Sequence, residues 1–380
     1  MDFNFTEEQL AFKEQVIKFA RKEIAPRCRE HDLASRFDRE SFRKLGEFGI
    51  LGLHLPEEFG GSDADVVTTV LAGEALGEAG VDGGLTLSYG AHTFLCADNI
   101  LKHGSQEQKE RYLPGLSSGE MIGCMGLTEP SAGSDVAAMR TRAEKKGDKY
   151  ILNGSKIFIT NGPVADVAVV YATLDRSLKH AGISAFVVDK DTPGFSTGAP
   201  LHKMGVRTSM TSELFFEDCQ IPEENLLGVE GGGFMMAMQT VEWDRSTLMA
   251  PFLGGSQFAL ERCAQYASER KQFGKPIADY QAIKLKLANM KIFLEATRAL
   301  VYRIAWCKDQ GRPLSHLEAA VAKLFIGDWS LGPANDAITL MGGYGYCHEY
   351  DMERNFRDGR LAAIGGGTSE IQKLIISKLM

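Results

Sequence analysis

The sequence has few of the features that mark common metal and nucleotide sites. Its seven cysteines are scattered without a CxxC pair, so we expect a reducing compartment and neither a metal site nor a disulfide framework. It also lacks GxxxxGK[ST], HExxH, GxSxG and a GxGxxG that follows a predicted strand. These absences give no support to a phosphate loop, a zinc protease, a serine hydrolase or a Rossmann dinucleotide fold.

Positive charge and long apolar runs are scarce as well. The formal net charge is −8 and the pI is near 5.6, which argues against a nucleic-acid partner because such proteins usually carry a basic face. No run of 18 apolar residues occurs, so no membrane span is predicted. The first residues have neither the basic start nor the apolar run of a signal peptide. We therefore expect a cytoplasmic protein.

The chain has 380 residues, which favours several domains over one compact core. Apolar residues recur with a helical period over 1–120, strand patterns replace them over 121–230, and helical patterns return over 231–380. This order predicts a mainly α protein with a central β domain. We expect an N-terminal helical domain, a middle β domain built as a small antiparallel barrel or sandwich, and a C-terminal helical bundle.

Two local signals predict where elements turn or begin. Asn153-Gly154 lies between two short β-prone runs and predicts a two-residue hairpin turn. Ser369 and Gln372 have the spacing of a capping box and predict the start of the last helix.

Four segments resemble the signature segments of the acyl-CoA dehydrogenase family. They are Leu-Thr-Glu-Pro-Ser-Ala-Gly-Ser-Asp at 127–135, Gly-Ser-Lys-Ile-Phe-Ile-Thr-Asn-Gly at 154–162, Glu-Arg-Lys-Gln-Phe-Gly at 269–274, and the stretch from Met-Gly-Gly-Tyr-Gly-Tyr to Gly-Thr-Ser-Glu at 341–370. One such segment alone is a weak signal, whereas four in the family's order over nearly the whole chain are specific. The resemblance implies an α–β-barrel–α architecture, FAD as cofactor and an acyl-CoA thioester as substrate.

The matching positions imply a set of FAD-binding residues. Arg270 and Gln281 are implied to reach the FAD pyrophosphate and ribose of a neighbouring subunit, and the planar fork of arginine suits phosphate oxygens. Taken on the residues alone, Phe158 between two isoleucines is more typical of a core, and Arg270 of a solvated helix face. The other implied FAD contacts are Met125, Leu127, Thr128, Gly133, Ser134, Phe158, Ile159, Thr160, Thr339, Gly342, Gly343, Thr368, Ser369 and Glu370.

The catalytic base is where the sequence departs from much of the family. The family's reaction needs a base for the α-proton while hydride leaves the β-carbon, and many members use a Glu two residues before the Thr of the last signature. Gly366 occupies that position here. It cannot take a proton, but its backbone N–H could still donate to the thioester oxygen.

A minority of the family, including isovaleryl-CoA and long-chain acyl-CoA dehydrogenases, carries the Glu on an earlier helix within Asp-x-Glu-Arg. The matching residues here are Glu242-Trp243-Asp244-Arg245, so we predict that Asp244 is the base. The alternative is a structural carboxylate paired with an arginine. The implied substrate contacts are Ser134, Trp243, Arg245, Gly366 and Gly367.

The resemblance thus predicts α,β-dehydrogenation of an acyl-CoA, with electrons passed to an electron-transferring flavoprotein by a homotetramer. A branched or alicyclic acyl group is favoured because glycine at 366 frees volume near the thioester. Two alternatives stay open. One is a cyclic acyl-CoA dehydrogenase with an altered elimination position, or an enoyl-CoA reductase. The other is a family-like scaffold without catalysis.

Overall fold

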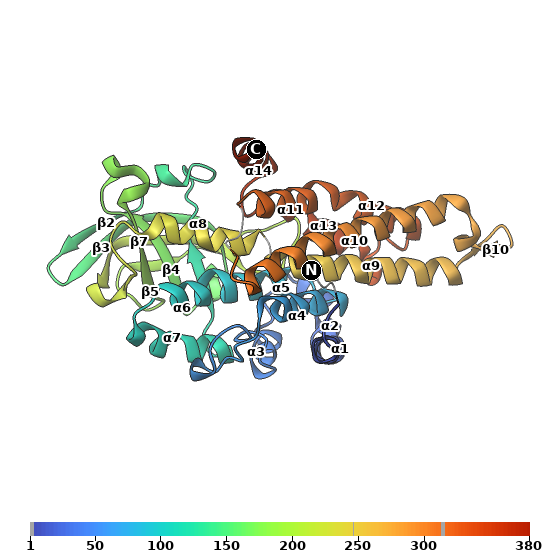
Figure 1. Cartoon of the computed structure of the whole chain (residues 1–380), viewed down its shortest axis with the longest axis horizontal. Coiled ribbons are helices and arrows are strands. Elements are labelled where there is room, and N and C mark those ends of the chain that lie inside the picture. Colours follow the sequence, from blue (N-terminus) through green and yellow to red (C-terminus); the bar gives the residue numbers. More distant parts are fainter. Residues whose placement is uncertain (1–3, 246, 313–315) are drawn as a thin grey trace.

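The computed structural model describes residues 4–245, 247–312 and 316–380, apart from the side chains of Glu242, Trp243 and Asp244. Its elements run from helices through a sheet back to helices (Figure 1). The predicted fold class, mainly α with a central β region, is confirmed.

The helices over residues 7–90 pack around one apolar core, and the two over 98–118 pack into a second core that they share with the sheet. The first helix begins with the side chain of Thr6 capping the backbone N–H of Gln9, as a capping box requires. Most connections between the helices are short, but residues 48–65 form a long one that includes a 3-10 helix at Glu57–Phe59. The helices are α1 (Glu7–Glu23), α2 (Ala25–Leu33), α3 (Arg39–Glu47), α4 (Val66–Glu78), α5 (Gly83–Gly90), the π-helical segment η2 (Ala91–Ala97), α6 (Asp98–His103) and α7 (Gln106–Ser118).

The central region is one eight-stranded sheet. Its hydrogen-bonded order is β6-β7-β3-β2-β4-β5-β8, with β1 beside β4. Most pairs are antiparallel, but β4 pairs in parallel with both β1 and β2. The strands are β1 (Gly123–Gly126), β2 (Arg142–Lys146), β3 (Lys149–Thr160), β4 (Val167–Thr173), β5 (Ile183–Asp189), β6 (Phe195–Thr197), β7 (Thr211–Pro222) and β8 (Leu226–Leu227).

The predicted hairpin turn at Asn153-Gly154 is wrong. Both residues lie inside the continuous strand β3, and the real turn is at Gly147, between β2 and β3. Asn153 and Asp218 exchange hydrogen bonds across β3 and β7, and the register shifts there between Leu152 and Gly154. Long-range pairing with β7 therefore overrides the local turn preference.

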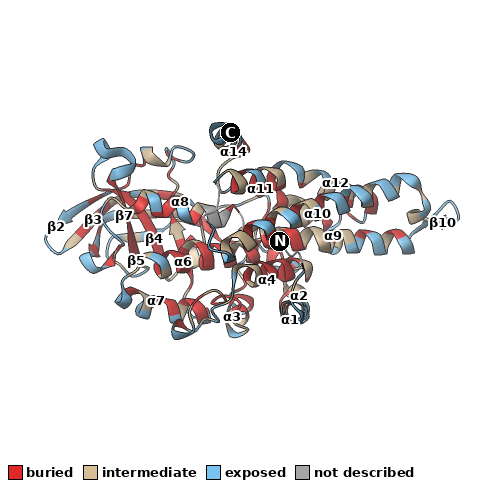
Figure 2. Cartoon of the chain, in the orientation of Figure 1, coloured by how far each residue is buried: buried red, intermediate tan, exposed pale blue. Residues whose placement is uncertain are grey.

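The C-terminal region is a helical bundle that packs on the N-terminal helices. Helix α9 lies against α4 at glycines, because a Cβ on Gly77 would stand 2.0 Å from the carbonyl oxygen of Pro251. Figure 2 shows buried residues gathered in the sheet and near α4, whereas the far ends of α9 and α10 are largely exposed. The helices are α8 (Gly233–Asp244), α9 (Ala250–Glu269), α10 (Gln281–Asp309), α11 (His316–Trp329), α12 (Leu331–Met341), α13 (Met352–Gly359) and α14 (Ser369–Leu379).

The cap of the last helix lies one residue before the predicted cap. Thr368 is the N-cap of α14, and its side chain accepts a hydrogen bond from the backbone N–H of Ile371. Ser369 is already helical, and its hydroxyl is turned to the carboxylate of Asp328. The predicted capping box at Ser369 and Gln372 is therefore corrected to a cap at Thr368.

Candidate active site

The first two signature segments are held together by backbone and side-chain hydrogen bonds. The N–H of Ile157 donates to the carbonyl of Thr128 at 2.9 Å, and the ammonium of Lys156 lies 3.3 Å from the carbonyl of Leu127. Leu127 and Thr128 follow β1, whereas the other two residues lie on β3. The structure thus brings these two predicted FAD-binding segments side by side.

A buried ion pair fixes this junction. The carboxylate of Glu129 lies 2.8 Å from the ammonium of Lys156, and both side chains are almost fully buried. Glu129 also accepts the backbone N–H groups of Arg140 and Thr141, at 2.5 and 2.9 Å. Burial alone would raise the pKa of Glu129, but the Lys156 charge and these hydrogen bonds bring that pKa below its usual value.

The end of β3 carries Phe158, Ile159 and Thr160. Phe158 has a φ of 60°, a conformation that is unusual for a bulky residue, and the pairing with β7 shifts register between Lys156 and Ile159. As a result the Phe158 ring is 65 % exposed while Ile159 is buried. The interpretation of Phe158 as a core residue is wrong, and its ring is available to a ligand.

The other residues that were predicted to bind FAD near this segment are either exposed or packed in the core. Gly133 and Ser134 lie exposed in the loop after Glu129, and a Cβ on Gly133 would meet nothing within 4 Å. Met125 lies on β1 and packs against the core between the sheet and the helices.

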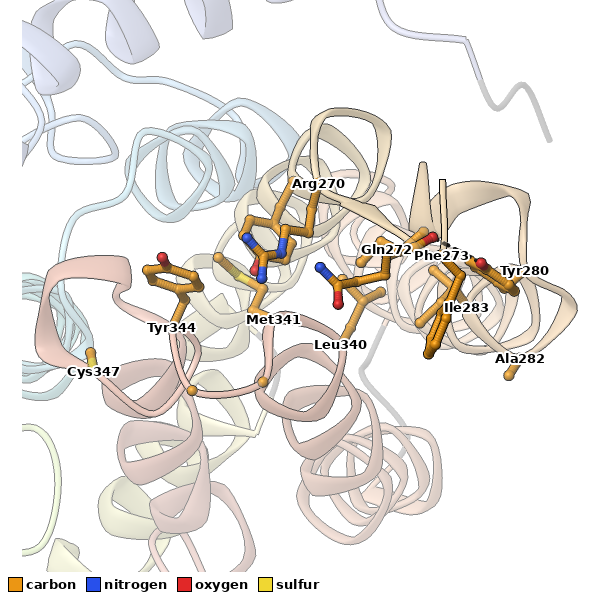
Figure 3. Close-up of a pocket in the computed structure, with 14 residues that line it drawn as sticks. Arg270, Gln272, Phe273, Tyr280, Ala282, Ile283, Leu340, Met341, Tyr344 and Cys347 are labelled. Carbon is orange, nitrogen blue, oxygen red and sulfur yellow. Dashed lines mark hydrogen bonds between the residues drawn. The ribbon is translucent and has the colours of Figure 1, made fainter. Parts of the chain in front are cut away.

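A second group of predicted residues lines a separate cavity of about 820 Å³, formed by residues of the C-terminal region (Figure 3). Arg270 faces it from the end of α9, and Gly342 and Gly343 form its floor after α12. A Cβ on either glycine would meet nothing within 4 Å. The other lining residues are mostly apolar or aromatic, among them Phe273, Ile277, Tyr280, Leu340 and Tyr344.

Two predicted residues lie beside this cavity without lining it. Gln281 begins α10, between the lining residues Tyr280 and Ala282. Thr339 is on α12, and its hydroxyl donates to the carbonyl of Asn335 one helical turn earlier.

The cavity and the β3 segment lie far apart within one chain. Figure 1 shows the sheet at one end of the long axis and the tip of α9 and α10, with strand β10 (Lys275–Pro276), at the other. The structure therefore does not bring Arg270 and Phe158 to one site of the same chain.

The third group is the glycine turn before α14. Gly366 and Gly367 have φ values of 65° and 94°, which glycine adopts without strain. The Arg245 guanidinium reaches the carbonyl of Gly366, with Nε at 3.4 Å. The predicted Trp243 and Asp244 side chains lie outside the described residues, but the backbone of Asp244 ends α8 immediately before Arg245. The Arg245 side chain thus links the end of α8 to the turn at 366, the two places at which the family carries its base.

Thr368, Ser369 and Glu370 line a smaller hollow of about 320 Å³. Asp328, Arg360 and Lys373 complete its polar wall.

The described residues fit FAD. An open glycine pair and Arg270 suit a pyrophosphate, the aromatic cavity wall suits an adenine ring, and the exposed Phe158 suits the flavin. By contrast, within the described ranges no three His, Cys, Asp or Glu side chains are grouped as metal ligands. No helix in the described part of the chain is long and apolar enough to cross a bilayer.

Several residues that shape these sites were not found from the sequence. Lys156 and Glu129 lie within the quoted signatures, yet only the fold shows that they pair. Lys323 and Gln372 bind the carbonyls of the glycine turn. The sequence carries no signal for Lys323 beyond a polar residue on an apolar helix face, and it suggested a capping role for Gln372. Phe273 and Tyr280 were missed because isolated aromatic residues in loops do not indicate a cavity wall.

Comparison with known proteins finds relatives over nearly the whole chain. Three family models match: the acyl-CoA dehydrogenase N-terminal domain over residues 6–120, the middle domain over 124–219 and the C-terminal domain over 231–380. The short-chain specific acyl-CoA dehydrogenase of Clostridium acetobutylicum is 44% identical over 99% of both chains. The mitochondrial isovaleryl-CoA dehydrogenase of Pongo abelii is 41% identical, over 98% of this chain and 88% of that protein.

Solved structures agree at the level of the whole chain. The butyryl-CoA dehydrogenase of Megasphaera elsdenii superposes with a TM-score of 0.95 at 41% identity, covering 100% of this chain and 99% of that one. PigA, solved with FAD and proline, superposes with a TM-score of 0.96 at 34% identity, with the same coverage. The chain therefore belongs to the acyl-CoA dehydrogenase family, a family of FAD-dependent oxidoreductases.

Proposed function

We propose that this chain oxidises the Cα–Cβ bond of an acyl-CoA thioester, with Asp244 as the base and Gly366 as a donor to the thioester oxygen. The observation that carries the proposal is the contact between Arg245 and Gly366. It links the end of α8 to the turn that carries the base in much of the family, and so supports a shared site. Position 366 lacks the side chain of the usual base, and position 244 supplies a carboxylate. Both features then belong to one site, in which the base has moved to α8.

When bound, FAD supplies the acceptor for the hydride that leaves the β-carbon. The Asp244 carboxylate takes the α-proton, and the electron pair of that C–H bond forms the new double bond. The backbone N–H of Gly366 donates to the thioester oxygen, where negative charge builds as the α-proton leaves. Aspartate is shorter than glutamate by one methylene, about 1.5 Å, so the substrate must approach α8 more closely.

The FAD would be shared between chains. We propose that Phe158, Thr160 and the 127–134 loop of one subunit hold the flavin. Arg270, Gln281, Gly342 and Gly343 of another subunit would hold the adenosine and pyrophosphate. This division is supported by the distance between the two groups within one chain (Figure 1), and it fits the proposed homotetramer. Thr339, Thr368, Ser369 and Glu370 are proposed as further FAD contacts.

The finer features of the activity are proposals as well. We infer a branched or alicyclic acyl group, an electron-transferring flavoprotein as acceptor, and a cytoplasmic location. Ser134, Trp243, Arg245 and Gly367 are proposed substrate contacts. A division into domains at 1–120, 121–230 and 231–380 is supported by the helix–sheet–helix order of the elements.

The test is anaerobic flavin bleaching by a panel of linear, branched and cyclic acyl-CoAs. We expect Asp244→Asn to retain FAD, yet to lose both bleaching and exchange of the α-proton with solvent. Glu242→Gln is the matched control, because two positions along a helix place its side chain about 200° away. If Asp244→Asn bleaches at the wild-type rate, the base lies elsewhere. If no acyl-CoA bleaches the wild-type protein, an inactive scaffold becomes the better description.

A further inference from the structure

The glycine turn before α14 is held by its carbonyl groups. The carbonyl of Gly366 accepts hydrogen bonds from Arg245 Nε and from Gln372 Nε2, at 3.4 and 3.1 Å. The carbonyl of Gly367 accepts from Gln372 Nε2 at 3.2 Å and from the ammonium of Lys323. The donors come from three places in the chain: the residue after α8, helix α11 and helix α14. Two successive peptide carbonyls therefore face one side of the turn.

The donors on that side are buried. Gln372 is fully buried, Lys323 is 1 % exposed and Arg245 is 8 % exposed. Removing an ammonium ion from water costs several kcal/mol unless it finds compensating partners. The Gly367 carbonyl is one such partner of Lys323. A positive charge thus stands fixed beneath a turn that has no side chain of its own.

The N–H groups of the turn lie on the opposite side. In a trans peptide the C=O and the following N–H point in opposite directions. The N–H of Gly367 therefore points away from Arg245, and the N–H of Thr368 points away from Lys323. Among the described residues, none accepts a hydrogen bond from the N–H of 366, 367 or 368. These three N–H groups can therefore donate hydrogen bonds to a ligand.

We propose that Lys323 and Gln372 are positioning residues for the substrate's thioester carbonyl, acting through the Gly366-Gly367 turn. The inference rests on the proposed function. Gln372 and Lys323 fix the two peptide planes that follow Gly366, and so hold the backbone of Gly366, whose N–H is the proposed donor to the thioester oxygen, in one conformation. The Lys323 charge lies on the same turn as the Gly366 donor, and it stabilises the negative charge that develops on the thioester oxygen. A glycine turn needs this support more than a turn with a side chain, because glycine is the least restricted residue.

The experiment measures flavin reduction per bound flavin in Lys323→Met, Lys323→Gln and Gln372→Met, using an acyl-CoA that bleaches the wild-type protein. We expect kcat to fall by about tenfold to a hundredfold, as a displacement of about 1 Å would produce. KM should change by less than about threefold, because most substrate contacts remain. Lys323→Gln, which keeps a donor but no charge, should fall between Lys323→Met and wild type. Lys291→Met, on an exposed surface pair of α10, is the control and should keep the wild-type rate.

The possible outcomes separate the two proposals. A wild-type protein that no acyl-CoA bleaches would remove the proposed function itself. A wild-type protein that bleaches, with variants of unchanged rate per flavin, would overturn only the positioning role. This holds even if those variants have a lower melting temperature or less FAD, because that pattern indicates a purely structural role. Lys323→Gln and Gln372→Met decide the question if Lys323→Met does not fold, since a normal rate in both contradicts the proposal.

Discussion

Lys156 is the residue on which the candidate flavin site depends most directly. Its ammonium is fully buried, binds Glu129 at 2.8 Å and also reaches the carbonyl of Leu127. Removing one partner of a buried ion pair leaves an uncompensated charge in a medium of low dielectric constant. The 127–135 loop would then lose its side-chain contacts with β3 and keep the backbone hydrogen bond between Ile157 and Thr128.

We therefore expect Lys156→Met to lower the free energy of unfolding by about 3–5 kcal/mol and to reduce the FAD content of the purified protein. Urea unfolding and the ratio of flavin to protein absorbance measure the two effects. Lys146→Met, at an exposed position on β2, is the control. The double variant Lys156→Met/Glu129→Gln should recover part of the loss, because no buried charge is left unpaired. An unchanged unfolding midpoint in Lys156→Met would show that the pair contributes nothing.

For single residues, the sequence predicts membership of the candidate site better than it predicts the contacts between its members. The Leu-Thr-Glu-Pro and Gly-Ser-Lys segments predict the flavin region, yet the pairing of Glu129 with Lys156 joins the loop after β1 to β3. Asp244 was predicted from its place beside Arg245 in a family pattern. The contact between Arg245 and Gly366 spans 121 positions, and no local pattern indicates it.

Strand β3 illustrates how an element can override its local signals. Pairing with β7 keeps it extended through Asn153-Gly154, a dipeptide that favours hairpin turns. The register then shifts between Lys156 and Ile159, and the pairing resumes for the last two residues of the strand. A positive φ at a bulky residue costs of order 1–3 kcal/mol, and such residues cluster at functional sites. The strain at Phe158 turns its ring outward, where we propose the flavin lies.

This strain predicts that glycine at position 158 gives a more stable protein than alanine, which reverses the usual order of stability. Both Phe158→Ala and Phe158→Gly remove the ring, but only glycine relieves the left-handed conformation. We expect FAD-free Phe158→Gly to be more stable than FAD-free Phe158→Ala by about 1 kcal/mol. Urea unfolding of the two apoproteins measures the difference, and both should retain FAD less well than wild type.

The matched control is the same pair of substitutions at Ile157, whose backbone has no positive φ. There glycine should be the less stable variant, because it gains more freedom in the unfolded chain. If alanine is also the better residue at 158, then Phe158 is not strained.

On the scale of the whole molecule, Asp358 joins all three regions of the chain. Its carboxylate accepts the N–H of Gly83 at the start of α5, at 3.1 Å, and the N–H of Val206 after the sheet's sixth strand, at 2.5 Å. Val206 is a β-branched residue with a φ of 46°, so its conformation needs such support. Apolar periodicity predicted the order of helices, sheet and helices. It could not predict this junction, because Gly83 and Val206 lie 275 and 152 positions away from Asp358 in the sequence.

Asp358 also makes the junction sensitive to pH. Burial, with Asp82 nearby, raises the pKa of Asp358 to about 7, although the Val206 N–H and Arg354 act in the opposite direction. Asp32, Arg357 and Lys203 are the other charged groups at this junction. An aspartate in the unfolded chain ionises near pH 4. Folding therefore binds a proton between about pH 4 and pH 7, and the contribution of Asp358 to stability falls as the pH rises through that range.

Asp358→Asn, which is neutral at every pH, should remove this dependence. We expect the variant to gain stability relative to wild type as the pH rises from 5 to 7, by at most about 1.4 kcal/mol per pH unit. Urea unfolding of both proteins at pH 5, 6, 7 and 8 measures the difference, with the exposed Asp191→Asn as control. Because the hydrogen bonds to Gly83 and Val206 join separate regions, the gain should appear in one cooperative transition rather than in the sheet alone. A difference between variant and wild type that does not change with pH would mean that Asp358 is ionised throughout this range, held by Arg354 despite its burial.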